Sequence, residues 1–186
     1  MNGAVPLCVD MDGTLLKTDT LPELLFRVIK QQPWVLMLLP LWCLRGRAFL
    51  KRALSERCVL RVDLLPVNAD FLSFLRDEKD HGRSLYLATG AYDTVAQQVA
   101  DYFGFFSGVL ATTDKNLTGS TKADVLVSQF GEKGFDYAGN SAVDRPCWEK
   151  ARQCYLVNAS PSTEKKMSTL FSFAAVFDPR SRVSLA

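Results

Sequence analysis

The stretch that most constrains the fold is Asp-Met-Asp-Gly-Thr at residues 10–14, which follows the apolar run Val5–Val9. A short, continuously apolar run is typical of a strand that is covered on both faces, and Gly13 lets the backbone turn sharply after it. Two carboxylates, Asp10 and Asp12, are costly to desolvate at such a strand end unless a cation or a reaction accounts for them. Open α/β sheets bind ligands at this carboxyl edge. The alternative is an ordinary Asp-Gly turn with two solvated acids.

Composition excludes several classes of protein. The chain has 186 residues, 48% of them hydrophobic, which is enough to bury the core of one domain with a subdomain. A net charge of +2 without a basic and aromatic motif indicates no nucleic-acid partner. Five cysteines without a CxxC pair indicate reduced core thiols and a cytoplasmic location. No signal peptide is predicted, and residues 31–44 are too short to span a bilayer by themselves.

Strand-like and helix-like segments alternate along the chain. Strands are predicted at 5–10, 84–88, 107–111, 135–138, 154–158 and 171–177, with a β-leaning stretch at 59–62. Helices are predicted at 21–29 (with Thr20 as N-cap), 45–54, 68–80, 92–103, 122–130 and 145–153, and one short helix or two half-helices at 33–44. The second main strand is expected to end in a turn at residues 89–91. The tail after Asp178 is expected to be a linker or the start of a further segment. This alternation predicts βαβ crossovers and a mainly parallel sheet.

Polar groups suited to one reaction follow several of these strands or open a helix: Asp10 with Asp12, Thr89, Lys122, and Asn140 with Asp144. Taken singly, Thr89 would be interpreted as a strand-end or capping residue, and Lys122 as a solvated helix residue. Their order resembles the motifs of the haloacid dehalogenase (HAD)-like hydrolase superfamily. Residues 10–14 fit its first motif, DxDGT, in full. Thr89 matches the second motif and Lys122 the third, whereas the GNSAVD segment at 139–144 matches the acidic fourth motif only in part.

The resemblance implies a fold class and a domain organisation. We expect an α/β, Rossmann-like core with a mainly parallel sheet, formed by residues 1–16 and 81–186. Residues 17–80 are expected to form a small, mostly helical cap inserted after the first strand, at the C1-type position.

The resemblance also implies a Mg²⁺-dependent phosphatase for a small phosphate monoester. Asp10 is then the nucleophile that becomes a phospho-aspartate, Asp12 the general acid and base, and Thr89 and Lys122 the groups that hold the phosphoryl oxygens. The substrate-binding positions are Gly13, Thr14 and Gly90, and the metal ligands are Asp10, Asp12 through its carbonyl, Asn140 and Asp144. Like charges repel by roughly 4 kcal/mol at about 4 Å in an effective dielectric of about 20, so attack by a carboxylate on a phosphate ester requires such cations.

Asn140 departs from the aspartate that the family commonly has. An amide oxygen can ligate Mg²⁺ but brings no charge. We therefore expect either weaker metal affinity or a shift of the acidic role to Asp144, which is also a candidate to orient Lys122. His81 matches no catalytic motif and is predicted to lie at the surface.

The apolar run 34–44 contains Trp34 and Trp42 and is followed by the basic segment RGRAFLKR. It is either an ordinary cap core with a solvated basic edge or an interfacial surface that approaches a membrane or an isoprenoid phosphate. The segments LLPLW, RGRAFLKR, LATGA, FDYAGN and VDRPCWEKAR are similar to the N-terminal HAD domain of bacterial UbiA-type prenyltransferase fusion proteins.

This closer resemblance implies a membrane prenyltransferase fused beyond residue 186, peripheral membrane contact at the inner face, and an isoprenoid-linked or sugar phosphate as substrate. The alternative function is a catalytically weak HAD-like domain that serves as an interaction or membrane-docking module of the prenyltransferase.

Overall fold

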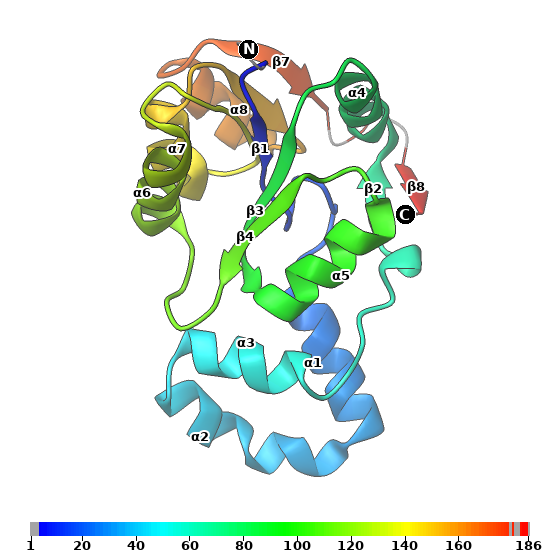
Figure 1. Cartoon of the computed structure of the whole chain (residues 1–186). Coiled ribbons are helices and arrows are strands. Elements are labelled where there is room, and N and C mark those ends of the chain that lie inside the picture. The colour runs from blue at the N-terminus through cyan, green and yellow to red at the C-terminus, as the bar shows by residue number, and fades with distance from the viewer. Residues whose placement is uncertain (1–3, 179, 181–182, 186) are drawn as a thin grey trace.

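A parallel sheet forms the centre of the molecule. Figure 1 shows the computed structural model, which describes residues 4–178, 180 and 183–185. Six strands of this described part are ordered β4-β3-β1-β5-β6-β7, and every neighbouring pair is parallel. Their bounds are β1 Leu7–Val9, β3 Leu85–Tyr92, β4 Gly108–Thr112, β5 Asp136–Gly139, β6 Cys154–Val157 and β7 Phe173–Phe177. The predicted α/β, Rossmann-like fold class is confirmed.

The two faces of the sheet carry separate hydrophobic cores. Leu7 and Val9 of β1 belong to one core, with α4 (Ala69–Asp80) and α5 (Asp93–Phe103), while Cys8 belongs to the other. That second core includes residues of α6 (Gly119–Phe130), α7 (Arg145–Lys150) and α8 (Pro161–Ser168). Because successive strand side chains point to opposite faces, a strand with two cores must be apolar throughout, as the run before Asp10 is.

The helical insert lies beyond the carboxyl edge of the sheet (Figure 1). It comprises α1 (Thr20–Gln31), the 3₁₀-helix η1 (Pro33–Met37), α2 (Leu39–Leu44) and α3 (Arg47–Ser55). Of the two alternatives for residues 33–44, one short helix or two half-helices, the structure shows the second; Pro33 and Pro40 each stand in the first turn of a helix, where proline is tolerated. The prediction of Thr20 as N-cap is wrong: Asp19 has the extended backbone of an N-cap and accepts a hydrogen bond from the Leu21 amide at 2.9 Å.

The rest of the predicted cap segment, up to residue 80, contacts the sheet. It contains η2 (Val62–Leu64), β2 (Pro66–Asn68) and α4, whose Phe74 packs on Tyr155 and Phe177 of β6 and β7. The limits 1–16, 17–80 and 81–186 remain a prediction. His81, which follows α4, is exposed as predicted.

Two local predictions are wrong, and one helix was not predicted. The β-leaning stretch 59–62 forms no strand within the described residues; the nearby strand is β2, which pairs antiparallel with β8 (Val183–Leu185). The tail after Asp178, for which a linker is one of the two expectations, therefore contributes a strand, while residues 179, 181, 182 and 186 of it lie outside the described residues. Helix α8 was not predicted because its polar sequence buries only one side chain, Met167.

Strand β3 is longer than predicted. The expected end before the turn at 89–91 is wrong, because β3 continues to Tyr92. Its register with β4 shifts on the way: Ala88 pairs with Leu110, whereas Tyr92 pairs with Thr112. Four residues of β3 thus oppose two of β4, which is a bulge. The irregularity falls on Thr89 and Gly90, two predicted site residues.

Candidate active site

Three neighbouring strands bring the predicted site residues to one edge of the sheet. Asp10 follows β1, Thr89 lies in β3, and Asn140 follows β5. Since β1 lies between β3 and β5, this edge is the switch point where an open α/β sheet binds ligands. A cavity of about 480 Å³ opens there between the sheet and the helical insert. Its lining includes Asp10, Asp12, Thr89, Gly90, Lys122, Asn140 and Asp144; Gly13 and Thr14 are not part of it.

Asp10 forms a buried ion pair with Lys122. The side chain of Asp10 is 11% exposed; its Oδ1 accepts a hydrogen bond from Lys122 Nζ at 2.6 Å, and its Oδ2 accepts one from Thr14 Oγ1 at 3.2 Å. Burial raises the pKa of Asp10, and the positive charge of Lys122 opposes this effect. Burial alone would lower the pKa of Lys122, but Asp10 and Asp144 together raise it. The ammonium is therefore held charged beside Asp10.

Tyr137 connects Lys122 to Asp144. Its hydroxyl accepts a hydrogen bond from Lys122 Nζ at 3.0 Å and donates one to Asp144 Oδ1 at 2.8 Å. Asp144 Oδ2 accepts hydrogen bonds from the amides of Asn140 at 3.0 Å and Ser141 at 3.1 Å. Both oxygens of Asp144 are thus bound by protein groups, and its Oδ1 is 3.8 Å from Lys122 Nζ. Sequence reasoning missed Tyr137; the available signal was a tyrosine in a fully buried strand, where its hydroxyl needs a partner.

Asp12 is held by the first residue of the helical insert. Its Oδ1 accepts a hydrogen bond from the backbone amide of Thr20 at 2.9 Å, at the N-terminus of α1. Burial raises the pKa of Asp12 to about 6. A carboxyl group with this pKa can both donate and accept a proton near neutral pH.

The turn after Asp12 touches the loop after β5. Gly13 has a φ of +77°, and a Cβ at this position would collide with the side-chain amide of Asn140. Glycine is therefore required on both grounds. The side chain of Asn158 donates hydrogen bonds to the carbonyls of Gly13 at 3.2 Å and Thr14 at 2.9 Å, which fixes the turn from the other side.

The β3 bulge presents a hydroxyl group and a carbonyl group. Thr89 is buried, and its Oγ1 accepts a hydrogen bond from the Ala91 amide at 3.0 Å, so the hydroxyl hydrogen remains available to donate. The carbonyl of Gly90 accepts hydrogen bonds from Lys51 Nζ and, at 2.8 Å, from Thr112 Oγ1.

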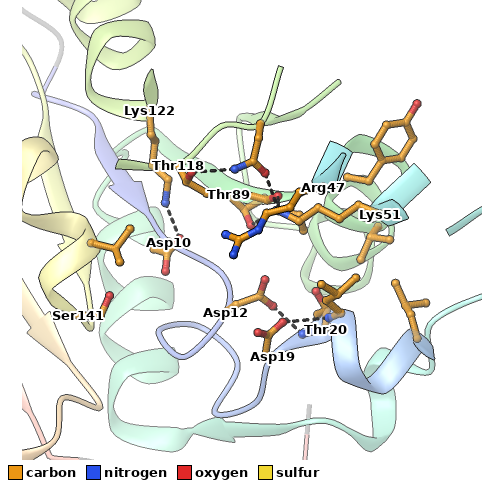
Figure 2. A pocket seen from close by; sticks show the side chains of 18 of the residues that line it. Asp10, Asp12, Asp19, Thr20, Arg47, Lys51, Thr89, Thr118, Lys122 and Ser141 are labelled. Carbon is orange, nitrogen blue, oxygen red and sulfur yellow. Dashed lines mark hydrogen bonds and ion pairs between the residues drawn. The ribbon is translucent and has the colours of Figure 1, made fainter. Parts of the chain in front are cut away.

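Two cations reach the cavity from α3. Lys51 Nζ binds Asn116 Oδ1 at 2.7 Å as well as the Gly90 carbonyl, and burial lowers its pKa. Arg47 points into the space between Lys51 and the two aspartates (Figure 2), and its guanidinium has no hydrogen-bond or ion-pair partner among the described residues. From the sequence alone, both are predicted only as part of the basic segment RGRAFLKR. Their spacing of four residues, which places them on one helix face, was the signal that both could line the same cavity.

The donor groups beside Asp10 suit a hard cation. Within residues 4–178, 180 and 183–185, no three His, Cys, Asp or Glu side chains gather to hold a metal ion. A cation would therefore use the Asp10 carboxylate together with neutral oxygens, namely the Asp12 carbonyl and the Asn140 amide. The side-chain amide of Asn140 lies beside Gly13, in the loop that also carries Asp10 and Asp12, with its nitrogen nearer to Gly13 than its oxygen. An all-oxygen set of this kind fits Mg²⁺.

Comparisons with known proteins agree with this fold. No family model matches the chain. The uncharacterized protein y4nM of Sinorhizobium fredii is 36% identical over 165 residues, which cover 88% of this chain. The chain spans about a third (32%) of that relative.

Solved structures are similar over most of the chain. A Bordetella pertussis protein of unknown function matches with a TM-score of 0.66 and 16% identity, over 95% of this chain and 99% of that one. A HAD-family hydrolase of Salmonella enterica serovar Typhi matches with a TM-score of 0.62 and 15% identity, over 88% of this chain and 66% of that one. A phosphoserine phosphatase with a phospho-aspartyl intermediate analogue matches with a TM-score of 0.62 and 14% identity, over 97% of this chain and 96% of that one. The chain therefore has the fold of the HAD-type hydrolases.

Proposed function

We propose that this domain is a Mg²⁺-dependent phosphatase that hydrolyses a phosphate monoester through a phospho-aspartate on Asp10. One observation carries the proposal: the buried Asp10 carboxylate is paired with Lys122 at 2.6 Å inside a cavity that Asp12 also lines. A buried carboxylate with a fixed ammonium is suited to nucleophilic attack on an anionic group. The fold that the chain shares with a HAD-type phosphatase supports the same function.

In the first step, a carboxylate oxygen of Asp10 attacks the phosphorus of the ester. The bond between phosphorus and the leaving oxygen breaks, and protonated Asp12 gives its proton to that oxygen, so an alcohol departs. Lys122 and the Thr89 hydroxyl donate to the phosphoryl oxygens, and each such donor is worth on the order of 3 kcal/mol in the transition state.

In the second step, Asp12 as a carboxylate removes a proton from water, and the water oxygen attacks the phosphorus. The bond from phosphorus to Asp10 breaks, which releases inorganic phosphate and restores both carboxyl groups to their starting states. The pKa of about 6 for Asp12 supports both proton transfers. Its hydrogen bond to Thr20 at 2.9 Å fixes the direction of the carboxylate.

Magnesium, held by Asp10, the Asp12 carbonyl and Asn140, would neutralise negative charge between the nucleophile and the phosphate. Asp144 then acts by holding Lys122 through Tyr137, because its own oxygens already accept hydrogen bonds from the protein.

The proposed substrate is an isoprenoid-linked or sugar phosphate, and the proposed partner is a prenyltransferase fused beyond residue 186. The resemblance of the segments in the sequence analysis supports both. Arg47 and Lys51 add support for a substrate with further polar or anionic groups next to the phosphate, because they reach the cavity from the side opposite Asp10. Sugar phosphates carry such polar groups, namely the hydroxyls of the sugar.

The proposal predicts phosphate release that depends on Mg²⁺. With a panel of serine, pentose and isoprenoid phosphates, we expect turnover that disappears in excess EDTA and returns when Mg²⁺ is added. An isoprenoid or sugar phosphate should give the highest kcat/KM. Absence of turnover on every ester with Mg²⁺ present would favour the alternative, a catalytically weak docking module, which the uncharged Asn140 also favours.

Asn140→Asp tests the proposed metal ligand. A second carboxylate beside Asp10 should raise the affinity for a divalent cation, so the Mg²⁺ concentration that gives half-maximal activity should fall by about tenfold. Asn116→Asp is a useful comparison, since it adds the same charge at the Lys51 side of the cavity. If both variants show the Mg²⁺ dependence of the wild type, residue 140 is not a ligand.

A further inference from the structure

Large apolar side chains are exposed at the end of the helical insert. Met37 is 84% exposed and Leu44 85% exposed. We call the following set the apolar cap face: Phe26, Trp34, Leu36, Met37, Leu41 and Leu44. These are six of the twelve exposed large hydrophobic residues in the described part of the chain, although they come from only residues 26–44. Figure 1 shows α2, which carries two of them, at the end of the molecule away from the sheet. Such a concentration marks an interaction site.

Exposed and buried side chains alternate along η1 and α2, which carry most of the apolar cap face. Trp34 and Met37 of η1 are three residues apart, as are Leu41 and Leu44 of α2, so each pair lies on the exposed side of its helix. Val35 and Trp42 lie between them in the chain and are buried. The exposure of the two pairs is therefore not a consequence of loose packing.

The two tryptophans of the apolar run 34–44 differ: Trp42 belongs to the cap core, the first alternative for this run, and does not form part of the exposed face. Trp42 is buried, and the guanidinium of Arg57 lies 4.5 Å from its ring centroid. Trp34 is the tryptophan that belongs to the exposed face.

The segment that carries most of this face is basic. From Leu24 to Ser55 the chain carries six basic residues and no Asp or Glu. Arg47 and Lys51 of this set line the cavity, and Arg52 pairs with Glu56 at 2.8 Å. The remaining three are neighbours of the apolar cap face in the sequence: Arg27 follows Phe26, Lys30 lies between Phe26 and Trp34, and Arg45 follows Leu44.

We propose that the apolar cap face docks on a lipid bilayer that contains anionic lipids. Its apolar side chains would enter the interfacial layer, and Arg27, Lys30 and Arg45 would meet the headgroups, the arrangement of an interfacial basic amphipathic surface. A second copy of the chain is the less suitable occupant, because a two-fold contact would bring the same cations together. The proposed docking is separate from the proposed phosphatase activity, and vesicle binding can be measured whether or not the protein hydrolyses a phosphate ester.

Vesicle co-sedimentation tests the docking. We expect the protein to bind vesicles of equimolar phosphatidylglycerol and phosphatidylcholine, and to bind vesicles of phosphatidylcholine alone at least tenfold less tightly. Met37→Ser/Leu44→Ser should weaken binding at least about tenfold. Lys30→Gln/Arg45→Gln should weaken it about fivefold for each charge, with a smaller salt dependence.

The matched control is Leu64→Ser/Leu170→Ser, which removes two half-exposed leucines outside the face and should leave binding unchanged. Equal loss in this control and in the Met37/Leu44 variant would overturn the proposal, as would binding that ignores the anionic lipid. Light scattering provides a further arm: a dimer that the Met37/Leu44 substitutions dissociate would assign the face to a second copy instead. Circular dichroism checks that each variant is folded.

Discussion

Asp10→Asn is expected to reduce phosphate release by at least about 10⁴-fold, the scale on which loss of a nucleophile acts. The amide is a poor nucleophile and cannot form the acyl phosphate that water then hydrolyses. Lys122 keeps the Tyr137 hydroxyl at 3.0 Å and Asp144 at 3.8 Å, so its ammonium remains compensated and the fold should persist. Single-turnover assays with acid quench measure the effect directly: the wild type should yield a hydroxylamine-sensitive phospho-protein, and the variant none.

The control for this experiment is Asp80→Asn, which makes the same chemical change at an exposed position at the end of α4. Its rate should match that of the wild type. Should Asp10→Asn retain the rate or the phospho-protein, another residue must be the nucleophile, and the mechanism built on the Asp10–Lys122 pair would be wrong.

The main features of the fold could be predicted because they depend on local patterns. The apolar run before Asp10 has to be a strand covered on both faces, and residues 8 and 9 do face different cores. Residues at the ends of parallel strands meet at one edge, so Asp10, Thr89 and Asn140 could be expected together before any coordinates were known.

The rest depends on contacts between distant segments. The sequence predicts Tyr137 only as a buried strand residue. In the structure its hydroxyl lies between Lys122 and Asp144 and is hydrogen-bonded to both. The sequence predicts Lys51 only as part of a solvated basic edge. In the structure α3 lies across the cavity, and the Lys51 ammonium binds the Gly90 carbonyl in the β3 bulge. Neither hydrophobic periodicity nor a motif encodes such partners, because they are fixed by the packing of the insert on the sheet.

The bulge in β3 shows the same limit at the scale of the backbone. Thr89-Gly90-Ala91 has the composition of a turn, and local propensity favours ending the strand there. Pairing with β4 overrides this preference, and a Cβ on Gly90 would lie 2.6 Å from Thr118 Cγ2. Glycine at this position is thus explained by close approach of the 116–118 loop and not by a turn.

Lys122→Met is expected to impair both stability and catalysis. It leaves the Asp10 carboxylate buried beside Thr14 without its ammonium partner, and removal of one member of a buried pair typically costs about 3 kcal/mol or more. Turnover should fall by about 10³-fold, because the phosphoryl oxygens lose a charged donor and Asp10 is favoured in its protonated, non-nucleophilic form. Denaturant unfolding and phosphate release measure the two effects separately.

A double-mutant cycle decides whether the stability loss comes from the unpaired carboxylate. Asp10→Asn/Lys122→Met removes both charges, so it should be more stable than Lys122→Met alone by about 2 kcal/mol, while remaining inactive. Lys150→Met is the matched control: this exposed lysine pairs with Glu132 at 3.0 Å at the surface, and its loss should cost less than about 1 kcal/mol. If the double variant is no more stable than Lys122→Met, the lysine contributes through its packing in the core and not through its charge, and the buried ion pair is not what holds Asp10 ready for attack.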